Sequence, residues 1–208
     1  SPKRKKLNVQ DSEPKSTKAK TTTRKRTQAK PKPEPAKIVE EVPIEEQHNI
    51  IFKPNEGPQT EFLAAGEREV LYGGSAGGGK SYAMLADPLR YMGHPSFSGL
   101  LLRHTTEELR ELIFKSQEMY PKIWPGIKWS ERKMQWTAPS GARLWMSYLD
   151  REDDVLRYQG LAFSWIGFDE LTQWASPFAW NYMRSRLRST APDLPIFMRA
   201  TTNPGGRG

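Results

Sequence analysis

The chain has 208 residues, no cysteine, three histidines and a formal net charge of +8. Without cysteine there is no disulfide and no thiolate metal site, and the scattered histidines lack the spacing of metal ligands. No apolar run approaches the about 20 residues of a membrane-spanning helix, and no signal-peptide core follows the basic start, so we expect a soluble intracellular protein.

The positive charge is concentrated at the start of the chain. Residues 1–37 hold 13 Lys or Arg and 3 Asp or Glu, so the remaining residues are slightly acidic. Residues 1–46 are poor in aromatic side chains and predict a disordered basic tail, followed by one folded domain over residues 47–208. The basic runs at 3–6 and 24–26 could bind DNA phosphates or resemble a nuclear-import signal. A solvated tail with weak, unspecific affinity for nucleic acid is the alternative.

The patterning of the rest predicts strands alternating with helices, which indicates an α/β fold with a mainly parallel sheet flanked by helices. Apolar runs, caps and turns predict these elements in chain order: a strand at 69–72, a helix at 80–92 with a kink at Pro88, a strand at 99–102, a helix from the capping box of Thr105 and Glu108 to about 119, a hairpin of 133–137 and 142–148, a strand at 163–168, a helix from Ser176 and Pro177 to about 187, and a strand at 196–200.

Residues 74–81 read G-S-A-G-G-G-K-S directly after the apolar run 70–72, the context in which G-x-x-x-x-G-K-[ST] is a phosphate-binding loop, or Walker A motif. Glycines let successive N–H groups surround an anion, and the following helix adds its positive end. Lys80 is expected to reach the β- and γ-phosphates, and Ser81 to ligate Mg²⁺. A flexible glycine linker would not explain Lys80 and Ser81. The candidate residues for binding a nucleoside triphosphate are Gly74, Ser75, Ala76, Gly77, Gly78, Gly79, Lys80 and Ser81.

An acidic pair, Asp169 and Glu170, follows the strand predicted at 163–168. Ligands of parallel sheets lie at the carboxyl ends of the strands, so both side chains should face the phosphate loop. Asp169 would hold Mg²⁺ as a Walker B aspartate does, and Glu170 would deprotonate the attacking water. Such a pair also occurs at ordinary helix N-termini. The interpretation as a catalytic pair therefore depends on the phosphate loop that precedes it in the chain.

Further polar residues are candidates for the same site. Thr201, Thr202 and Asn203 end the last predicted strand and could reach the γ-phosphate or the attacking water, or they could form an ordinary polar turn. Gln59, upstream of the first strand, could bind an adenine edge or be a surface glutamine.

Charge on the γ-phosphate also calls for an arginine. Arg103 and Arg157 are the candidates for this catalytic arginine, and either could instead be a surface cation. The arginine could also come from another subunit.

In this order, the motifs resemble the N-terminal ATPase domain of the large terminase subunit of tailed bacteriophages. The matching segments are Pro58-Gln59, 74–81, 101–103, Tyr158-Gln159-Gly160, 165–170 and 201–204, within residues 50–208. The resemblance implies an ASCE-type P-loop ATPase that uses Mg²⁺ and ATP to drive viral double-stranded DNA into a procapsid. It also implies a homo-oligomeric ring on the portal, a small terminase subunit that selects DNA, and assembly in the host cell cytoplasm.

The resemblance implies roles for single residues as well. Gln59 would read adenine, residues 201–203 would couple hydrolysis to movement, and Arg157 lies near the region of the inter-subunit arginine. The family normally continues into a nuclease domain, but this sequence stops after the coupling motif. We expect the acidic residues at 150–154 to form a solvated loop, so no cleavage activity is assigned to them.

Two other classes of function remain open. One is a different P-loop enzyme, such as a helicase-like translocase or a nucleotide kinase. The chain is too short for a second helicase lobe, and no lid or acceptor pocket of a kinase is evident. The other is a nucleotide-responsive DNA-binding module without turnover. The pair Asp169 and Glu170 argues against it, because a pure switch needs no base beside the metal.

Overall fold

The computed structural model describes residues 52–75 and 79–205. The segment predicted as a basic tail, residues 1–46, lies outside the described residues, so its predicted disorder and its boundary stay predictions. Among the described residues, no helix combines the length and the apolar character that crossing a membrane requires.

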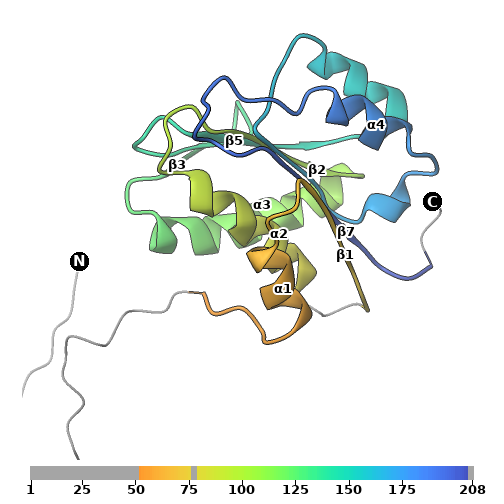
Figure 1. The fold of residues 1–208 in the computed structure, drawn as a ribbon, viewed down its shortest axis with the longest axis horizontal. Helices are drawn as coiled ribbons and strands as arrows, with labels where there is room; N and C mark the ends of the chain where they lie inside the picture. The colour runs from red at the N-terminus through yellow and green to blue at the C-terminus, as the bar shows by residue number, and fades with distance from the viewer. Residues whose placement is uncertain (1–51, 76–78, 206–208) are drawn as a thin grey trace, which may run out of the picture. The chain divides into compact units, whose positions relative to one another are not determined.

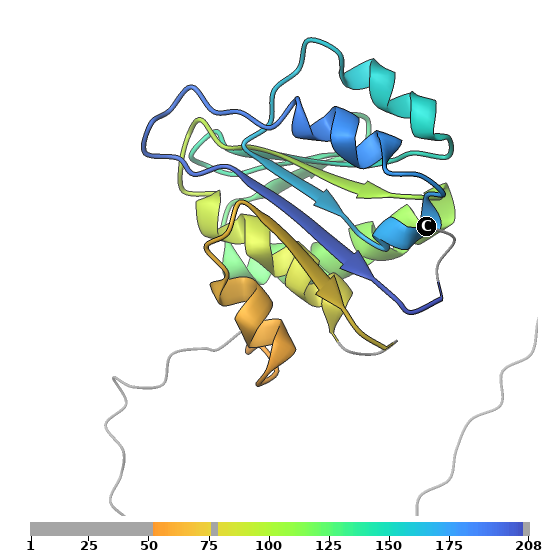
Figure 2. The ribbon, with the colours of Figure 1, turned by 45° about the vertical axis from the view of Figure 1, so that its right-hand side comes forward.

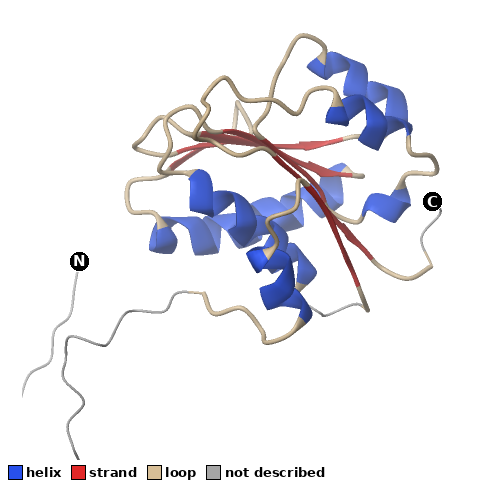
Figure 3. Cartoon of the chain, in the orientation of Figure 1, coloured by secondary structure: helices blue, strands red, loops and turns tan. Residues whose placement is uncertain are grey.

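A seven-stranded sheet in the order β1-β7-β6-β2-β5-β4-β3 is the middle layer of the described part (Figure 3). Five strands, from β1 to β5 in this order, are parallel, and β4 and β3 add an antiparallel extension. The strands are β1 (Glu69–Gly73), β2 (Ser98–Arg103), β3 (Lys128–Ser130), β4 (Gln135–Thr137), β5 (Arg143–Tyr148), β6 (Trp165–Phe168) and β7 (Phe197–Thr202).

Helices cover both faces of this sheet, as Figures 1 and 2 show. One face carries α1 (Pro58–Ala64), α2 (Lys80–Ala86) and α3 (Thr106–Ile123), and the other carries α4 (Phe178–Arg184). Short 3-10 helices complete the described chain: η2 (Asp87–Tyr91), η3 (Glu152–Tyr158) and η4 (Leu171–Gln173).

Each face of the sheet has its own apolar core. In β2, Leu101 packs with Met84 of α2 on one face, whereas Leu100 and Leu102 pack with Met183 of α4 on the other. A strand buried on both faces needs apolar side chains at successive positions, which is why it reads as an uninterrupted apolar run.

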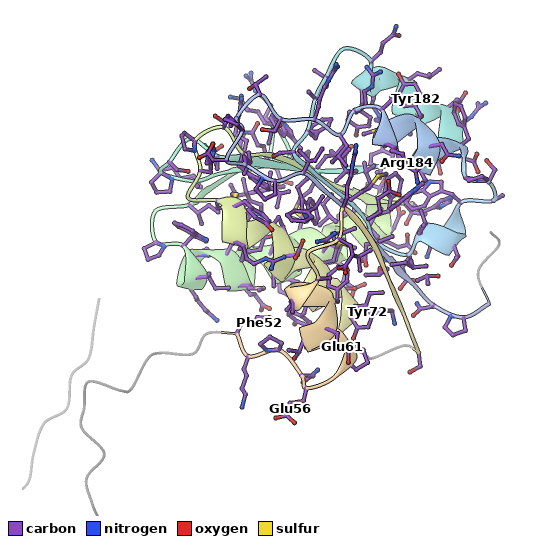
Figure 4. The ribbon with its side chains drawn as sticks, in the orientation of Figure 1. Phe52, Glu56, Glu61, Tyr72, Tyr182 and Arg184 are labelled. Carbon is purple, nitrogen blue, oxygen red and sulfur yellow. The ribbon has the colours of Figure 1, made fainter. Side chains whose placement is uncertain are left out.

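Strand β1, which leads into the phosphate loop, is tied to helices of both faces. The ring of Tyr72 packs on Phe62 of α1 with 5.4 Å between centroids. On the other face, Arg184 of α4 donates to Glu69 at 2.5 Å. Figure 4 labels Tyr72 beside α1 and Arg184 on α4, across the sheet. These contacts fix the strand that positions the loop.

The predicted parallel sheet, hairpin and capping box are confirmed. Thr105 Oγ1 accepts the Glu108 N–H at 3.3 Å, and the Glu108 carboxylate accepts the Thr105 N–H at 3.3 Å. The helix predicted at 80–92 was too long: α2 ends at Ala86 and a 3-10 helix follows. Pro88 is the reason, because it has no N–H for the next helical hydrogen bond.

Other boundaries also differ from prediction. Helix α4 begins at Phe178, not at Pro177, and ends at Arg184, while the Ser176 hydroxyl accepts the Phe178 N–H at 3.3 Å. The sixth strand begins only at Trp165, because Phe163 instead forms an isolated bridge to another segment.

Of the acidic residues expected in a solvated loop, Asp150 precedes η3, whereas the other three form its first turn: Glu152, Asp153 and Asp154. Negative side chains are favoured in the first turn of a helix, where they face unpaired N–H groups. Neither this 3-10 helix nor strand β3 was predicted.

Candidate functional site

The predicted phosphate loop connects β1 to α2. Of its residues, Ala76, Gly77 and Gly78 lie outside the described residues. The buried Lys80, the first residue of α2, donates from Nζ to the carbonyl oxygens of Gly74 at 2.9 Å and Ser75 at 2.6 Å. The ammonium group is therefore held inside the loop, where an incoming phosphate would compete with these carbonyls.

Gly79 ends the loop in a conformation that favours glycine. Its φ is 72°, and a Cβ atom there would lie 2.7 Å from Gln59 Nε2. The buried Gln59 donates from Nε2 to Gly79 O at 2.8 Å and accepts the Asn55 N–H at 2.6 Å. Gln59 thus anchors the loop. An adenine would have to compete for the same amide, so the adenine role stays a prediction.

Asp169, fully buried at the end of β6, contacts the phosphate-loop helix. Its Oδ2 atom lies 3.3 Å from Ser81 Oγ, and its Oδ1 accepts the Thr201 hydroxyl at 2.5 Å. Arg103 Nη1 lies 3.1 Å from Oδ2 and places a positive charge beside the carboxylate. A carboxylate and a hydroxyl are oxygen donors of the kind that Mg²⁺ takes, so the residues fit this metal.

Glu170 has a backbone conformation that is unusual for its residue type, with φ 63° and ψ 52°. Non-glycine residues in the left-handed region are strained and gather at functional sites. Its N–H donates to Thr201 Oγ1 at 2.9 Å, and Asn203 Nδ2 donates to its carboxylate, 2.6 Å from each oxygen. Burial and the charge of Asp169 raise the pKa of Glu170, which makes its carboxylate a stronger base.

The end of β7 is joined to the segment after β6. Thr201 bridges the acidic pair, the Thr202 and Thr172 hydroxyls lie 2.6 Å apart, and Asn203 holds Glu170. Asn203 Oδ1 is buried and has no hydrogen-bond partner among the described residues. Thr202 and Asn203 are therefore both placed at the acidic pair, and this amide oxygen can accept a hydrogen bond from a ligand or water.

The two candidate arginines lie in different surroundings. Arg103, at the end of β2, is buried beside Asp169 and 4.0 Å from Glu170 Oε1. The exposed Arg157 instead donates to Asp154 O at 3.1 Å and to Tyr148 O. Within the described residues, no hydrogen bond or ion pair joins it to the acidic pair. The fold brings Arg103 to this site and leaves Arg157 outside it.

A cavity of about 540 Å³ opens beside the acidic pair. Glu170 and Asn203 line one side, and Glu108 and Gln173 also line it. Gln173 Nε2 donates to Glu108 Oε1 at 2.8 Å. From the sequence, Glu108 was expected only to cap a helix, and no local pattern indicated its contact with Gln173. The remaining lining residues are His104, Thr105, Thr172, Pro204 and Gly205.

No protein-family model matches the chain, and no curated protein matches it in sequence. Solved structures match its fold. The large terminase of a thermophilic bacteriophage has a TM-score of 0.57 at 16% identity, over 73% of this chain and 40% of that chain. The same protein in complex with ADP has a TM-score of 0.52 at 17% identity, over 70% and 37%. The ATPase domain of the Thermus phage P74-26 large terminase has a TM-score of 0.52 at 14% identity, over 73% and 65%.

The chain thus spans 40% of the first of these terminases and 65% of the P74-26 domain. At such low identities a match establishes the fold alone, and this fold agrees with the resemblance that the motifs carried. The chain has the fold of the ATPase domain of phage large terminases.

Proposed function

We propose that this chain is a Mg²⁺-dependent ATPase domain whose hydrolysis of ATP drives viral DNA packaging. The observation that carries the proposal is the network at the carboxyl ends of β1, β6 and β7. There Asp169 meets Ser81 of the phosphate loop, and Glu170 is held by Asn203. A purely structural cluster would not need a carboxylate in a strained backbone conformation facing a cavity.

The proposed chemistry assigns one task to each group. Lys80 and the loop N–H groups bind the β- and γ-phosphates. Ser81 and Asp169 would hold Mg²⁺, which neutralises charge on the phosphates when bound. Glu170 accepts the proton of the attacking water. Asn203 Oδ1, which has no hydrogen-bond partner among the described residues, orients that water.

The arginines take different parts in this proposal. Arg103 serves its own subunit, because it lies 3.1 Å from Asp169. Arg157 lies outside the site of its own chain and is exposed, which suits a residue that acts on a neighbouring subunit of a ring.

The packaging role rests on the fold and on the motifs. One matched terminase structure contains ADP, which supports the proposal that this chain binds a nucleotide. We propose that hydrolysis releases Glu170 from Asn203 and so moves the end of β7, passing the change to a surface that grips double-stranded DNA. The partners would be the portal of the procapsid and a small terminase subunit, in the host cell cytoplasm.

Phosphate release from Mg-ATP tests the proposal. The full chain should release phosphate. Glu170→Gln should slow release by about 10²- to 10⁴-fold, whereas Asp153→Asn, which neutralises an exposed acid, should leave it unchanged. Nucleotide-dependent DNA binding without any phosphate release would contradict the ATPase and favour a switch.

Mixing two inactive variants locates the arginine. A mixture of the Glu170→Gln and Arg157→Ala variants should regain ATPase activity if Arg157 acts on a neighbouring subunit. Some sites in a mixed ring then combine an intact Glu170 with an intact Arg157 from the neighbour. Glu170→Gln with Arg103→Ala should show no recovery, because Arg103 acts in its own subunit and every site lacks one of the two groups.

A further inference from the structure

Arg103 is held at the acidic pair in an incompletely bonded state. Its guanidinium lies 3.1 Å from Asp169 Oδ2 and 4.0 Å from Glu170 Oε1. Its Nε and Nη1 groups are buried, yet neither forms a hydrogen bond of good geometry with any described residue. Buried donors without partners are unfavourable. The ion pair therefore keeps the guanidinium near Asp169 but leaves these two groups without a hydrogen bond to a described residue.

A third carboxylate, Glu108 of α3, lines the cavity beside Glu170. Glu108 is half-buried, accepts the Thr105 N–H at 3.3 Å through Oε2 and accepts Gln173 Nε2 at 2.8 Å through Oε1. Burial alone would raise the pKa of Glu108, but the Gln173 hydrogen bond, the charge of Arg103 and the Thr105 bonds together lower it. The charge of Arg103 therefore acts on Glu108 as well as on the acidic pair, with which it forms its ion pairs.

The bond between Glu108 and Gln173 spans two separate elements. Glu108 lies in the first turn of α3, and Gln173 ends η4, the short helix that directly follows Glu170. Both side chains line the cavity beside Glu170. This bond thus joins Glu108 directly to the segment that carries the proposed base.

We propose that Glu108 is a positioning residue that receives the Arg103 guanidinium when a divalent cation binds Asp169, and that it releases Gln173 in doing so. The proposal rests on the proposed function, because it takes Asp169 as a metal ligand. Two cations cannot share one buried carboxylate oxygen without strong repulsion, so Arg103 must leave Oδ2. Besides Glu170, Glu108 is the carboxylate that lines the neighbouring cavity among the described residues, and we take it as the new partner.

This exchange links metal binding to the geometry around the base. Arg103 moves from the acidic pair toward the cavity, where phosphate charge would develop. The released Gln173 amide also faces this cavity, three positions after Glu170. Without a carboxylate at position 108, Arg103 would stay on Asp169 and compete with the metal.

The test measures how strongly Mg²⁺ enhances the binding of a non-hydrolysable ATP analogue, by calorimetry with and without the metal. Glu108→Gln should reduce this enhancement by about tenfold and leave metal-free binding unchanged. Glutamine retains a side-chain oxygen for the capping box, so α3 should still form. Glu107→Gln is the matched control, because it removes the same charge from an exposed position in the same turn.

A double-mutant cycle separates this role from a structural one. Arg103→Gln alone should raise the affinity for Mg²⁺, because the competing cation is gone. In that background, Glu108→Gln should have no further effect on Mg²⁺ enhancement. Thermal unfolding of each variant checks that the fold is retained.

Two results overturn the proposal. In the first, Glu108→Gln changes the Mg²⁺ enhancement of analogue binding no more than Glu107→Gln does. In the second, Glu108→Gln has an equal effect on this enhancement with Arg103 present and with Arg103→Gln. If the full chain binds the analogue with Mg²⁺ but the variants give either of these results, only the role of Glu108 is contradicted. The proposed function is then retained. A full chain that binds no analogue contradicts both.

Discussion

Two buried arginine–aspartate pairs lie toward opposite ends of the same sheet, and their surroundings differ. Arg199 of β7 and Asp87 of η2 are both fully buried, with Nε 3.4 Å from Oδ2. Arg199 also donates to the carbonyl oxygens of Glu67 at 2.8 Å and Ala65 at 3.0 Å, while Trp165 Nε1 donates to Asp87 at 2.7 Å. Only the Nε atom of this arginine lacks a hydrogen bond among the described residues.

In the pair of Arg103 and Asp169, the aspartate accepts the Thr201 hydroxyl at 2.5 Å, but the arginine lacks such support. Two guanidinium nitrogens of Arg103 have no hydrogen-bond partner among the described residues, and Glu170 beside the pair opens onto a cavity. Backbone carbonyls hold Arg199 in one arrangement, whereas we propose that Arg103 exchanges its carboxylate partner. The difference leads us to expect that the first pair stabilises the fold, and it supports the role proposed for the second pair at the site.

The largest expected effect separates the two aspartates. Asp87→Asn should lower the free energy of unfolding by about 3–5 kcal/mol, because Arg199 would stay buried without its counter-charge. Asp169→Asn should cost far less stability and abolish the effect of Mg²⁺ on nucleotide binding. Urea unfolding of both variants measures the free energy of unfolding, and nucleotide titrations measure the effect of Mg²⁺. Equal losses of stability would contradict the difference between the two aspartates.

Removing the loop cation should affect binding more than folding. Lys80→Ala should weaken nucleotide binding by about 10- to 100-fold, because a charge-assisted contact to phosphate is lost. Lys133→Ala, which removes an exposed cation in a strand-to-strand turn, is the control. A fluorescent nucleotide provides the measurement, and unchanged affinity in Lys80→Ala would rule out the phosphate-loop assignment.

A smaller effect is expected at the loop exit. Gly79→Ala should destabilise the chain by about 1–2 kcal/mol more than Gly57→Ala, although both positions have positive φ. The difference arises because a Cβ at Gly79 would lie 2.7 Å from Gln59, whereas Gly57 faces open space. Thermal unfolding of the two variants gives the comparison, and equal costs would show that Gln59 moves aside freely.

The smallest effect belongs to an exposed pair. Arg184 and Glu69 lie 2.5 Å apart, with 48% and 31% of their side chains exposed. Arg184→Ala should change the free energy of unfolding by about 0–1 kcal/mol, because solvent screens such pairs. If urea unfolding showed that Arg184→Ala lowers the free energy of unfolding nearly as much as Asp87→Asn, burial would not distinguish these ion pairs.

The parts of the site that local pattern determines could be predicted from the sequence. The glycine-rich loop, the acidic pair after an apolar run and the polar end of the last strand each carry a short signal, and the parallel sheet brings them together. The pair of Arg199 and Asp87 has no such signal, because its residues are 112 positions apart and meet only through packing. The contact of Gln173 with Glu108 was missed for the same reason.

Errors in the fold came from competing local preferences. A helical pattern continued past Ala86, but Pro88 converted its end to a 3-10 helix. The acidic residues before Tyr158 were interpreted as a solvated loop because their charge was considered without their helix-capping tendency.

The rate of phosphate release by Glu170→Gln, with nucleotide affinity measured on the same preparation, tests the proposed hydrolysis most directly. We predict a rate about 10²- to 10⁴-fold below that of the unmodified chain, with nucleotide affinity changed only a few-fold. Unmodified chain and variant releasing phosphate at the same rate would contradict the assignment of Glu170 as the base.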